Sequence, residues 1–165
     1  MDRINRHFYI VPKQEQVARL MLKLGISVRD GDAYCGPIKQ TDAAVARALN
    51  VDRRVVRYTI DRIMSEPELY SLFSKIKSTL LLDDAAPEIG CSSIEVIPVN
   101  SQVPGLMADI LGVLSRERIN VRQAVVSDPQ DTAGSHLIIV ADGKIPGNTL
   151  AEIRSVNGVA SVIIK

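Results

Sequence analysis

The spacing of hydrophobic residues changes once along this chain, at the acidic segment 83–90. That segment combines Pro with Gly and shows no apolar period. Before it, apolar residues recur at helical spacing, and after it short β-branched runs alternate with helical ones. The change restricts the chain to two small domains of different class. We predict a mainly helical domain over residues 1–82, a linker over 83–92 and an α+β domain over 93–165.

The two parts also differ in charge. Residues 1–82 carry 14 Lys and Arg against 9 Asp and Glu, whereas residues 83–165 carry 6 against 10. Unequal charge along a chain is typical of proteins with two kinds of partner, and the basic part is the candidate for a polyanion. Ordinary scatter in surface charge is the alternative.

Turn residues and the apolar period predict the secondary structure of the first part. Asp30-Gly31 between short β-branched runs indicates a hairpin of strands near 26–28 and 33–35. Ser65 and Glu68 have the spacing of a capping box, so a helix is expected to begin there. The other helices are expected where apolar residues recur every three or four positions: residues 12–24, 42–49 and 53–65.

Residues 41–60 contain the pattern of a helix-turn-helix. Asn50 lies where the turn requires a left-handed backbone, which Asn tolerates better than most residues. Ala46 is small where the two helices cross, Val51 is expected to enter the core, and Asp52 can cap the second helix. Together these residues resemble the helix-turn-helix of DNA-binding regulators, in which the second helix enters the major groove.

The outer face of that second helix is basic. Arg53, Arg54 and Arg57 lie in its first turns, with Tyr58 and Arg62 beside them. Arginine near the start of a recognition helix can bond guanine or clamp phosphates. We therefore predict that these five residues contact double-stranded DNA. A merely solvated helix face and a helical protein-interaction module are the alternatives.

Strand and helix patterns alternate in the second part. Their order is βαββαβ, which is that of the ferredoxin-like fold. The expected fold class is α+β, with an N-terminal, mostly helical helix-turn-helix-like domain and a C-terminal ferredoxin-like domain. A first helix is expected around Met107 to Leu114 and a second at 148–155. The strands are expected at residues 94–99, 121–127, 136–141 and 159–164.

The turn between the first strand and its helix is a candidate ligand site. Pro104-Gly105 shapes the turn, and the helix after it offers unpaired N–H groups that suit a carboxylate. Asn120 adds a polar group where the chain enters the second strand. The sequence therefore suggests a small ligand with a carboxylate for this part of the chain.

These residues and the βαββαβ order resemble the ACT domain, a regulatory module that commonly binds amino acids. The likeness spans about residues 93–165, nearly all of the second part. Gln102 stands where the ACT motif usually has Asp; an amide oxygen still accepts a hydrogen bond but adds no counter-charge. The matching stretches are Gln102-x-Pro104-Gly105-x-Met107, Ile119-Asn120-Val121 and Gly158-Val159.

The resemblance implies a homodimer, or a larger oligomer, formed through the ACT-like domain with an amino acid at the interface. By the same likeness, backbone N–H groups of Gly105 and Leu106 would face the ligand carboxylate. Gln102 and Asn120 would lie near its amino group, and the flanking Val103 and Val121 complete the candidate ligand-binding set. A domain that dimerises but has a degenerate ligand site is the alternative.

The whole chain is similar to small archaeal proteins described as predicted regulators of amino-acid metabolism. Residues 52–57 and Tyr34-Cys35-Gly36 carry that likeness. It implies an amino-acid-responsive regulator, and a transcription regulator is the leading hypothesis. The alternative is a regulatory adaptor that does not bind DNA and docks onto an amino-acid biosynthetic enzyme through its helical domain.

The chain offers little for catalysis. A nucleophilic cysteine needs a positioned base, and the sequence suggests none for Cys35 or Cys91. We expect no enzyme activity, no catalytic residue, no metal site and no cofactor. No apolar run approaches the roughly 20 residues of a bilayer span, so no membrane partner is expected. The start of the chain lacks the apolar core of a secretory signal, which indicates a cytoplasmic protein.

Overall fold

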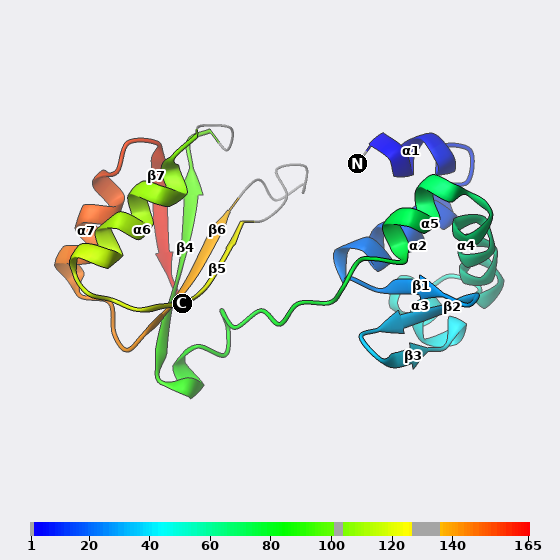
Figure 1. The fold of residues 1–165 in the computed structure, drawn as a ribbon, viewed down its shortest axis with the longest axis horizontal. Coiled ribbons are helices and arrows are strands. Elements are labelled where there is room, and N and C mark those ends of the chain that lie inside the picture. The colour runs from blue at the N-terminus through cyan, green and yellow to red at the C-terminus, as the bar shows by residue number, and fades with distance from the viewer. Residues whose placement is uncertain (1, 101–103, 127–135) are drawn as a thin grey trace. The chain divides into compact units, whose positions relative to one another are not determined.

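The computed structural model describes residues 2–100, 104–126 and 136–165, and it divides the chain into two compact units, Met1–Leu80 and Leu81–Lys165 (Figure 1). Each unit is built around a hydrophobic core of its own. The first unit is mainly helical with a small sheet, and the second is a sheet with helices, so the α+β prediction is confirmed. No helix in the described ranges is long and apolar enough to span a membrane.

Helices pack around a small antiparallel sheet in the N-terminal unit. Asp30 and Gly31 both have positive φ, at 50° and 77°, and form the turn of the predicted hairpin. The first helix and the third strand of this unit were not predicted from the sequence. The elements are α1 (Asp2–Phe8), α2 (Pro12–Lys23), β1 (Ser27–Arg29), β2 (Asp32–Cys35), β3 (Ile38–Gln40), α3 (Asp42–Leu49), α4 (Arg53–Ser65) and α5 (Pro67–Phe73).

Helix α4 forms much of the core of this unit. Val56, Ile60 and Ile63 recur on one helical face and are fully buried. Burying each of these side chains stabilises the fold by roughly 1.5–3 kcal/mol. The same periodicity sends the charged residues of α4 toward its opposite face.

The start of α5 differs from the prediction. The N-cap is Glu66, which makes no side-chain capping bond. Ser65 is still the last residue of α4, and its hydroxyl donates to the carbonyl of Arg62 at 3.0 Å. The capping box predicted at Ser65 and Glu68 is therefore wrong, because the backbone of Ser65 is helical and not in the extended conformation of a cap.

The C-terminal unit is ferredoxin-like. Its strands form one antiparallel sheet in the order β5-β6-β4-β7, and both helices lie on the same face of that sheet (Figure 1). Ile94 in the middle strand pairs with Ile139 on one side and Ile164 on the other. The elements after a short 3-10 turn at Pro87–Ile89 are β4 (Cys91–Pro98), α6 (Leu106–Arg116), β5 (Val121–Val126), β6 (Leu137–Asp142), α7 (Gly147–Ser155) and β7 (Val159–Ile164).

The predicted linker, residues 83–92, is part of this second unit. Ala86 is fully buried in a small apolar cluster with Cys91, which already belongs to β4. Asp83 is also buried, and its Oδ2 accepts a 2.7 Å hydrogen bond from Nζ of Lys165. The linker prediction was wrong because the partners of these residues lie far along the chain, where local composition cannot reveal them.

We predict that Asp83→Asn destabilises the C-terminal unit by about 1 kcal/mol near pH 7. The Lys165 ammonium holds the pKa of the Asp83 carboxyl below its ordinary value of 3.8. A lowered pKa in the folded state gives stability that is present above the unfolded-state pKa and lost as pH falls through the folded one. Thermal unfolding followed by circular dichroism should therefore show a lower Tm for the variant near pH 7.

The difference in Tm should shrink as the pH falls below 3.8 and through the lowered pKa of the folded state, below which both states protonate the carboxyl. Asp84→Asn is the matched control, because Asp84 is 90% exposed and lies 3.7 Å from the same ammonium. The same loss of Tm in both variants, or no loss in either, would contradict the role assigned to Asp83.

Candidate functional site

Helices α3 and α4 have the bounds that the sequence predicts, and a tight turn joins them. Asn50 adopts the left-handed conformation, with φ 52° and ψ 46°, and its N–H closes the last turn of α3. Asp52 caps α4, because its Oδ1 accepts the N–H of Arg54 at 2.8 Å. Thr41 caps α3 in the same way through the N–H of Ala44. This pair is helix-turn-helix-like in its turn, caps and packing.

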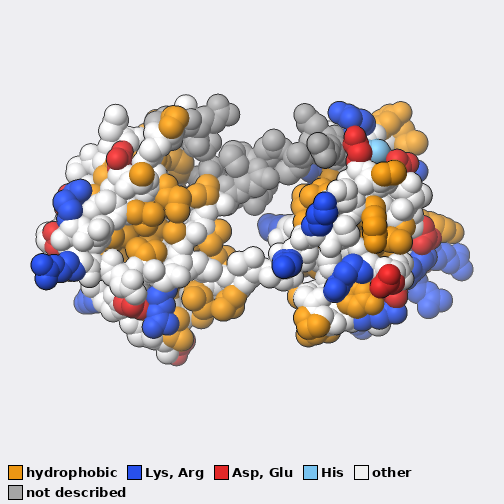
Figure 2. All heavy atoms as spheres, in the orientation of Figure 1, with side chains coloured by type: hydrophobic (Ala, Val, Ile, Leu, Met, Phe, Trp, Pro, Cys, Tyr) orange, Lys and Arg blue, Asp and Glu red, His pale blue; other side chains and the backbone are white. Residues whose placement is uncertain are grey.

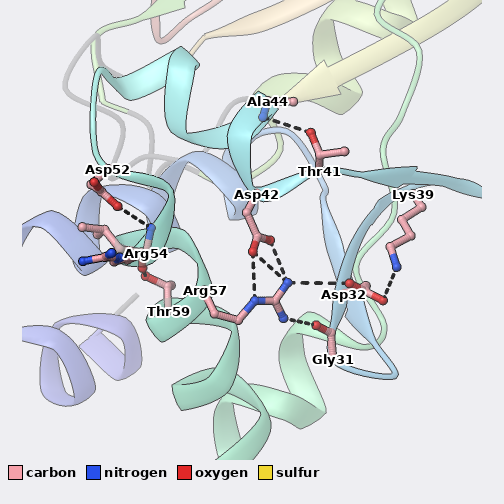
Figure 3. A network of polar contacts seen from close by, with 11 residues as sticks. Gly31, Asp32, Lys39, Thr41, Asp42, Ala44, Asp52, Arg54, Arg57 and Thr59 are labelled. Atoms are coloured by element: carbon pink, nitrogen blue, oxygen red, sulfur yellow. Dashed lines mark hydrogen bonds and ion pairs between the residues drawn. The ribbon is translucent and has the colours of Figure 1, made fainter.

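Arg57 joins α4 to α3 and to the hairpin. Its Nε and Nη2 donate to the two carboxylate oxygens of Asp42 at 2.9 and 2.8 Å, a bidentate pairing. Its Nη1 donates to the carbonyl of Gly31 at 2.6 Å, and Nη2 lies 3.7 Å from Asp32. The guanidinium points toward the hairpin turn (Figure 3). One side chain therefore fixes the position of the hairpin against both helices.

Arg62 is also bound within the fold. Its Nη1 donates to the carbonyl of His7 at 2.9 Å, and its guanidinium lies 5.7 Å from the centre of the Phe8 ring. Two of the five predicted DNA contacts, Arg57 and Arg62, thus use their guanidinium groups inside the unit. Sequence reasoning missed this because both bind backbone carbonyls distant along the chain, which no residue pattern marks.

The other three predicted contacts face solvent. Arg53 and Arg54 are exposed, and within the described part of the chain their side chains make no hydrogen bond or ion pair. Tyr58 is 58% exposed. Lys and Arg side chains gather along the edge of the N-terminal unit at which α4 lies (Figure 2). The structure therefore leaves two arginines at the first turn of α4 available for a ligand.

An open recess lies between the hairpin and the first turns of α3 and α4. Its volume is about 440 Å³, and its lining includes four cationic side chains and two carboxylates. The Nζ of Lys39 donates to Asp32 at 2.6 Å, and this bond lowers the pKa of the Asp32 carboxyl below its ordinary value. Lys39 was not singled out from the sequence, because an exposed lysine on a short strand carries no signal by itself. The charged lining comprises Asp32, Lys39, Asp42, Arg53, Arg54 and Arg57.

The predicted ligand residues of the second unit fall in two places. Gly105 is the N-cap of α6 with φ 93°, and Leu106 begins that helix and packs on the core. Asn120 precedes β5, and Val121 is its first residue. Gln102 and Val103, which the sequence also predicts for this site, lie outside the described residues.

The sheet separates these two places within one chain. Leu106, next to Gly105, lies against Gly158, whose carbonyl accepts the N–H of Val99 just after β4. Asn120 instead contacts Asp142, which pairs with Cys91 at the start of β4. A strand of this length spans roughly 20–25 Å. One chain therefore does not bring Gly105 and Asn120 together.

The side chain of Asn120 has a fixed orientation. Its Nδ2 donates to Oδ2 of Asp142 at 2.7 Å, and Arg122 donates to the other carboxylate oxygen. These two bonds lower the pKa of the Asp142 carboxyl below its ordinary value. A carboxylate accepts only from the NH₂ side of the amide, so Oδ1 of the exposed Asn120 is left as an acceptor. The sequence did not indicate Asp142 as the partner of Asn120, because its only local feature is that it precedes Gly143.

Residues with metal-binding chemistry do not cluster in the described part of the chain. Across residues 2–100, 104–126 and 136–165, no three His, Cys, Asp or Glu side chains lie close enough to hold a metal ion. The functional candidates are therefore the basic face of the first unit and the hydrogen-bonding groups at the two ends of the second unit's sheet.

No family model and no curated protein sequence matches this chain. Among solved structures, it is similar to the ACT domain of the GTP pyrophosphokinase of Chlorobium tepidum, with 22% identity over 46% of this chain and 96% of that one, at a TM-score of 0.37. A homoserine dehydrogenase of Thiobacillus denitrificans is 19% identical over 74% of this chain and 27% of its own, at a TM-score of 0.36. A transcriptional regulatory protein of the ASNC family from Pyrococcus furiosus is 12% identical over 92% of this chain and 85% of its own, at a TM-score of 0.29. All three likenesses are distant, and none assigns an activity to this chain.

We predict that Arg57→Ala lowers the stability of the N-terminal unit by about 1 kcal/mol. The variant loses a bidentate pair and a bond to a carbonyl, but the side chain is 38% exposed, so solvent screens part of the interaction. Arg53→Ala is the matched control and should change stability by less than about 0.5 kcal/mol. Urea unfolding followed by circular dichroism measures both, and equal losses would contradict the structural role of Arg57.

Proposed function

We propose that the chain is an amino-acid-responsive transcription regulator that binds double-stranded DNA through α3 and α4. The observation that carries the DNA-binding proposal is the pair of unengaged guanidinium groups, Arg53 and Arg54, at the first turn of α4. Arginine at this position can donate to guanine or to phosphate oxygens. The turn at Asn50 and the cap at Asp52 support the proposal, because they hold that first turn in one conformation.

The C-terminal unit is the proposed dimerisation and ligand-binding part. Within one chain, the N-terminus of α6 and Asn120 lie at opposite ends of the sheet, which supports a ligand site completed by a second copy of the chain. The fixed amide of Asn120 presents an acceptor, as an ammonium group requires. The helix terminus at Gly105 suits the carboxylate of the same ligand. An amino acid carries both groups.

Ligand binding would act on DNA affinity by favouring one arrangement of the two copies. A ligand shifts an equilibrium only when it binds the two states with different affinity. A tenfold change in DNA affinity requires a coupling free energy of about 1.4 kcal/mol. The proposed regulation therefore needs only a small difference in contacts between the DNA-bound and free dimers.

A non-DNA-binding adaptor is the second candidate. Ile38 and Tyr58 are 65% and 58% exposed. Each is a large side chain of the N-terminal unit that a protein partner would cover. This candidate would be favoured over the first if the folded chain bound no duplex even at low salt.

The first prediction for this function concerns salt. If the protein contacts about five phosphates, the logarithm of its affinity for a labelled duplex should fall against the logarithm of salt concentration with a slope near −4 to −5. Replacing both Arg53 and Arg54 by Gln should reduce that slope by about 2, because each released contact is worth about 0.9. Fluorescence anisotropy titrations at several salt concentrations measure the slope.

The double variant Lys13→Gln/Lys23→Gln is the matched control. It removes the same charge from exposed positions on α2, outside the recess. Its slope should stay that of the wild type. An unchanged slope for the arginine variant, or equal changes in both double variants, would contradict contact through the first turn of α4.

A second prediction concerns the ligand. Isothermal titration calorimetry with each of the common amino acids should give heat with at least one of them, and Asn120→Ala should weaken that binding at least tenfold, since it removes a hydrogen bond to a charged group. Asn148→Ala, at an exposed position on α7, is the control and should bind like the wild type. Heat from none of the amino acids would leave the unit a purely structural dimerisation module.

A further inference from the structure

We infer that the hairpin β2–β3 is a second nucleic-acid contact, which presents Lys39 to a phosphate of the DNA backbone at the recess beside α4. This inference rests on the proposed DNA binding and adds to it a contact outside the helix-turn-helix-like pair. It also changes the role of Arg57, from a base-reading residue to a positioning residue that places the hairpin.

The charges around the recess favour an anion. Both carboxylates of its lining are already engaged, Asp42 by Arg57 and Asp32 by Lys39. Lys39 uses one of its three ammonium donors in that bond and is 58% exposed, so two donors remain for a ligand. Arg53, on the same recess, has an unengaged guanidinium. Among the described residues of the recess, each carboxylate is paired with a cation, whereas Lys39 and Arg53 keep unused N–H donors.

The hairpin is rigid enough to serve as a contact. Arg29, the last residue of β1, donates from Nη2 to the carbonyl of Gly36 at 2.7 Å, which ties the turn between β2 and β3 to the neighbouring strand. The same guanidinium lies 4.4 Å from the centre of the Tyr34 ring. A surface that is ordered before binding loses less conformational entropy when it binds. The tip itself, from Gly36 to Lys39, is exposed to solvent.

Arg57 sets the position of this contact relative to α4. Arg57 bonds Gly31 in the turn between β1 and β2, just before β2, and it also bonds Asp42 of α3 (Figure 3). Asp32, next in the chain, holds the ammonium of Lys39. Lys39 is therefore linked to α4 through two bonds, from Lys39 to Asp32 and from Gly31 to Arg57. The contact from the hairpin and the contact from α4 would then reach one DNA backbone at a fixed separation.

The test is a double-mutant cycle on the full chain with a fluorescein-labelled, random-sequence duplex. Lys39→Gln should reduce the salt slope of binding by about 0.9, the value of one phosphate contact, and Lys13→Gln should leave it unchanged. Arg57→Lys keeps the charge but loses the bidentate geometry. In that background Lys39→Gln should have no further effect, because the hairpin is no longer held at the recess. Circular dichroism checks that each variant is folded.

Each outcome decides between the two proposals. Binding of the duplex by the wild type with an unchanged slope for Lys39→Gln overturns the hairpin contact and leaves DNA binding in place. No binding of the duplex by the wild type at low salt overturns both. If Arg57→Lys does not fold, the comparison of Lys39→Gln with Lys13→Gln still decides the contact. A thermal shift with inorganic phosphate that Lys39→Gln abolishes, without duplex binding, would identify the recess as a site for free phosphate instead.

Discussion

The guanidinium of Arg57 lies where the hairpin, α3 and α4 meet, and the arrangement of the basic face depends on its bonds. A planar group with donors in two directions can satisfy the Asp42 carboxylate on one side and the carbonyl of Gly31 on the other. Lysine has the same charge but lacks this fork. An arginine that looks like a DNA contact in the sequence therefore joins the hairpin turn to the two helices.

The C-terminal unit shows the same division between side chains that hold structure and side chains left for a ligand. Asp142 holds the amide of Asn120 in one orientation, and Lys165 holds Asp83 over the sheet. Among the described residues, the Asn120 oxygen and the N-terminus of α6 are the groups proposed to hold the ligand. Since the sheet keeps these apart in one chain, the proposed ligand site depends on a second copy, and so does the proposed control of DNA affinity.

Much of this architecture could be predicted from the sequence because its signals are local. The bounds of α3 and α4 follow from the apolar period of each helix, and Asp52 marks the start of α4. The left-handed turn follows from Asn50, one of the few residues that adopt that conformation at low cost. The βαββαβ order follows from strand and helix patterns within single segments. Each of these features is decided by residues within a few positions of one another.

Contacts between residues distant along the chain were decided only by the tertiary structure. Nothing near Arg57 or Arg62 in the sequence shows that they bind the carbonyls of Gly31 and His7, since every residue has a carbonyl. The acidic segment before β4 reads as a linker, although Ala86 and Asp83 find partners on the sheet. The sequence by itself determined α3 and α4, the turn between them and the cations that they carry. The tertiary structure decided which of those cations bind groups of the fold and which remain for a partner. This depends on which carboxylates and carbonyls the packed elements bring within hydrogen-bonding distance.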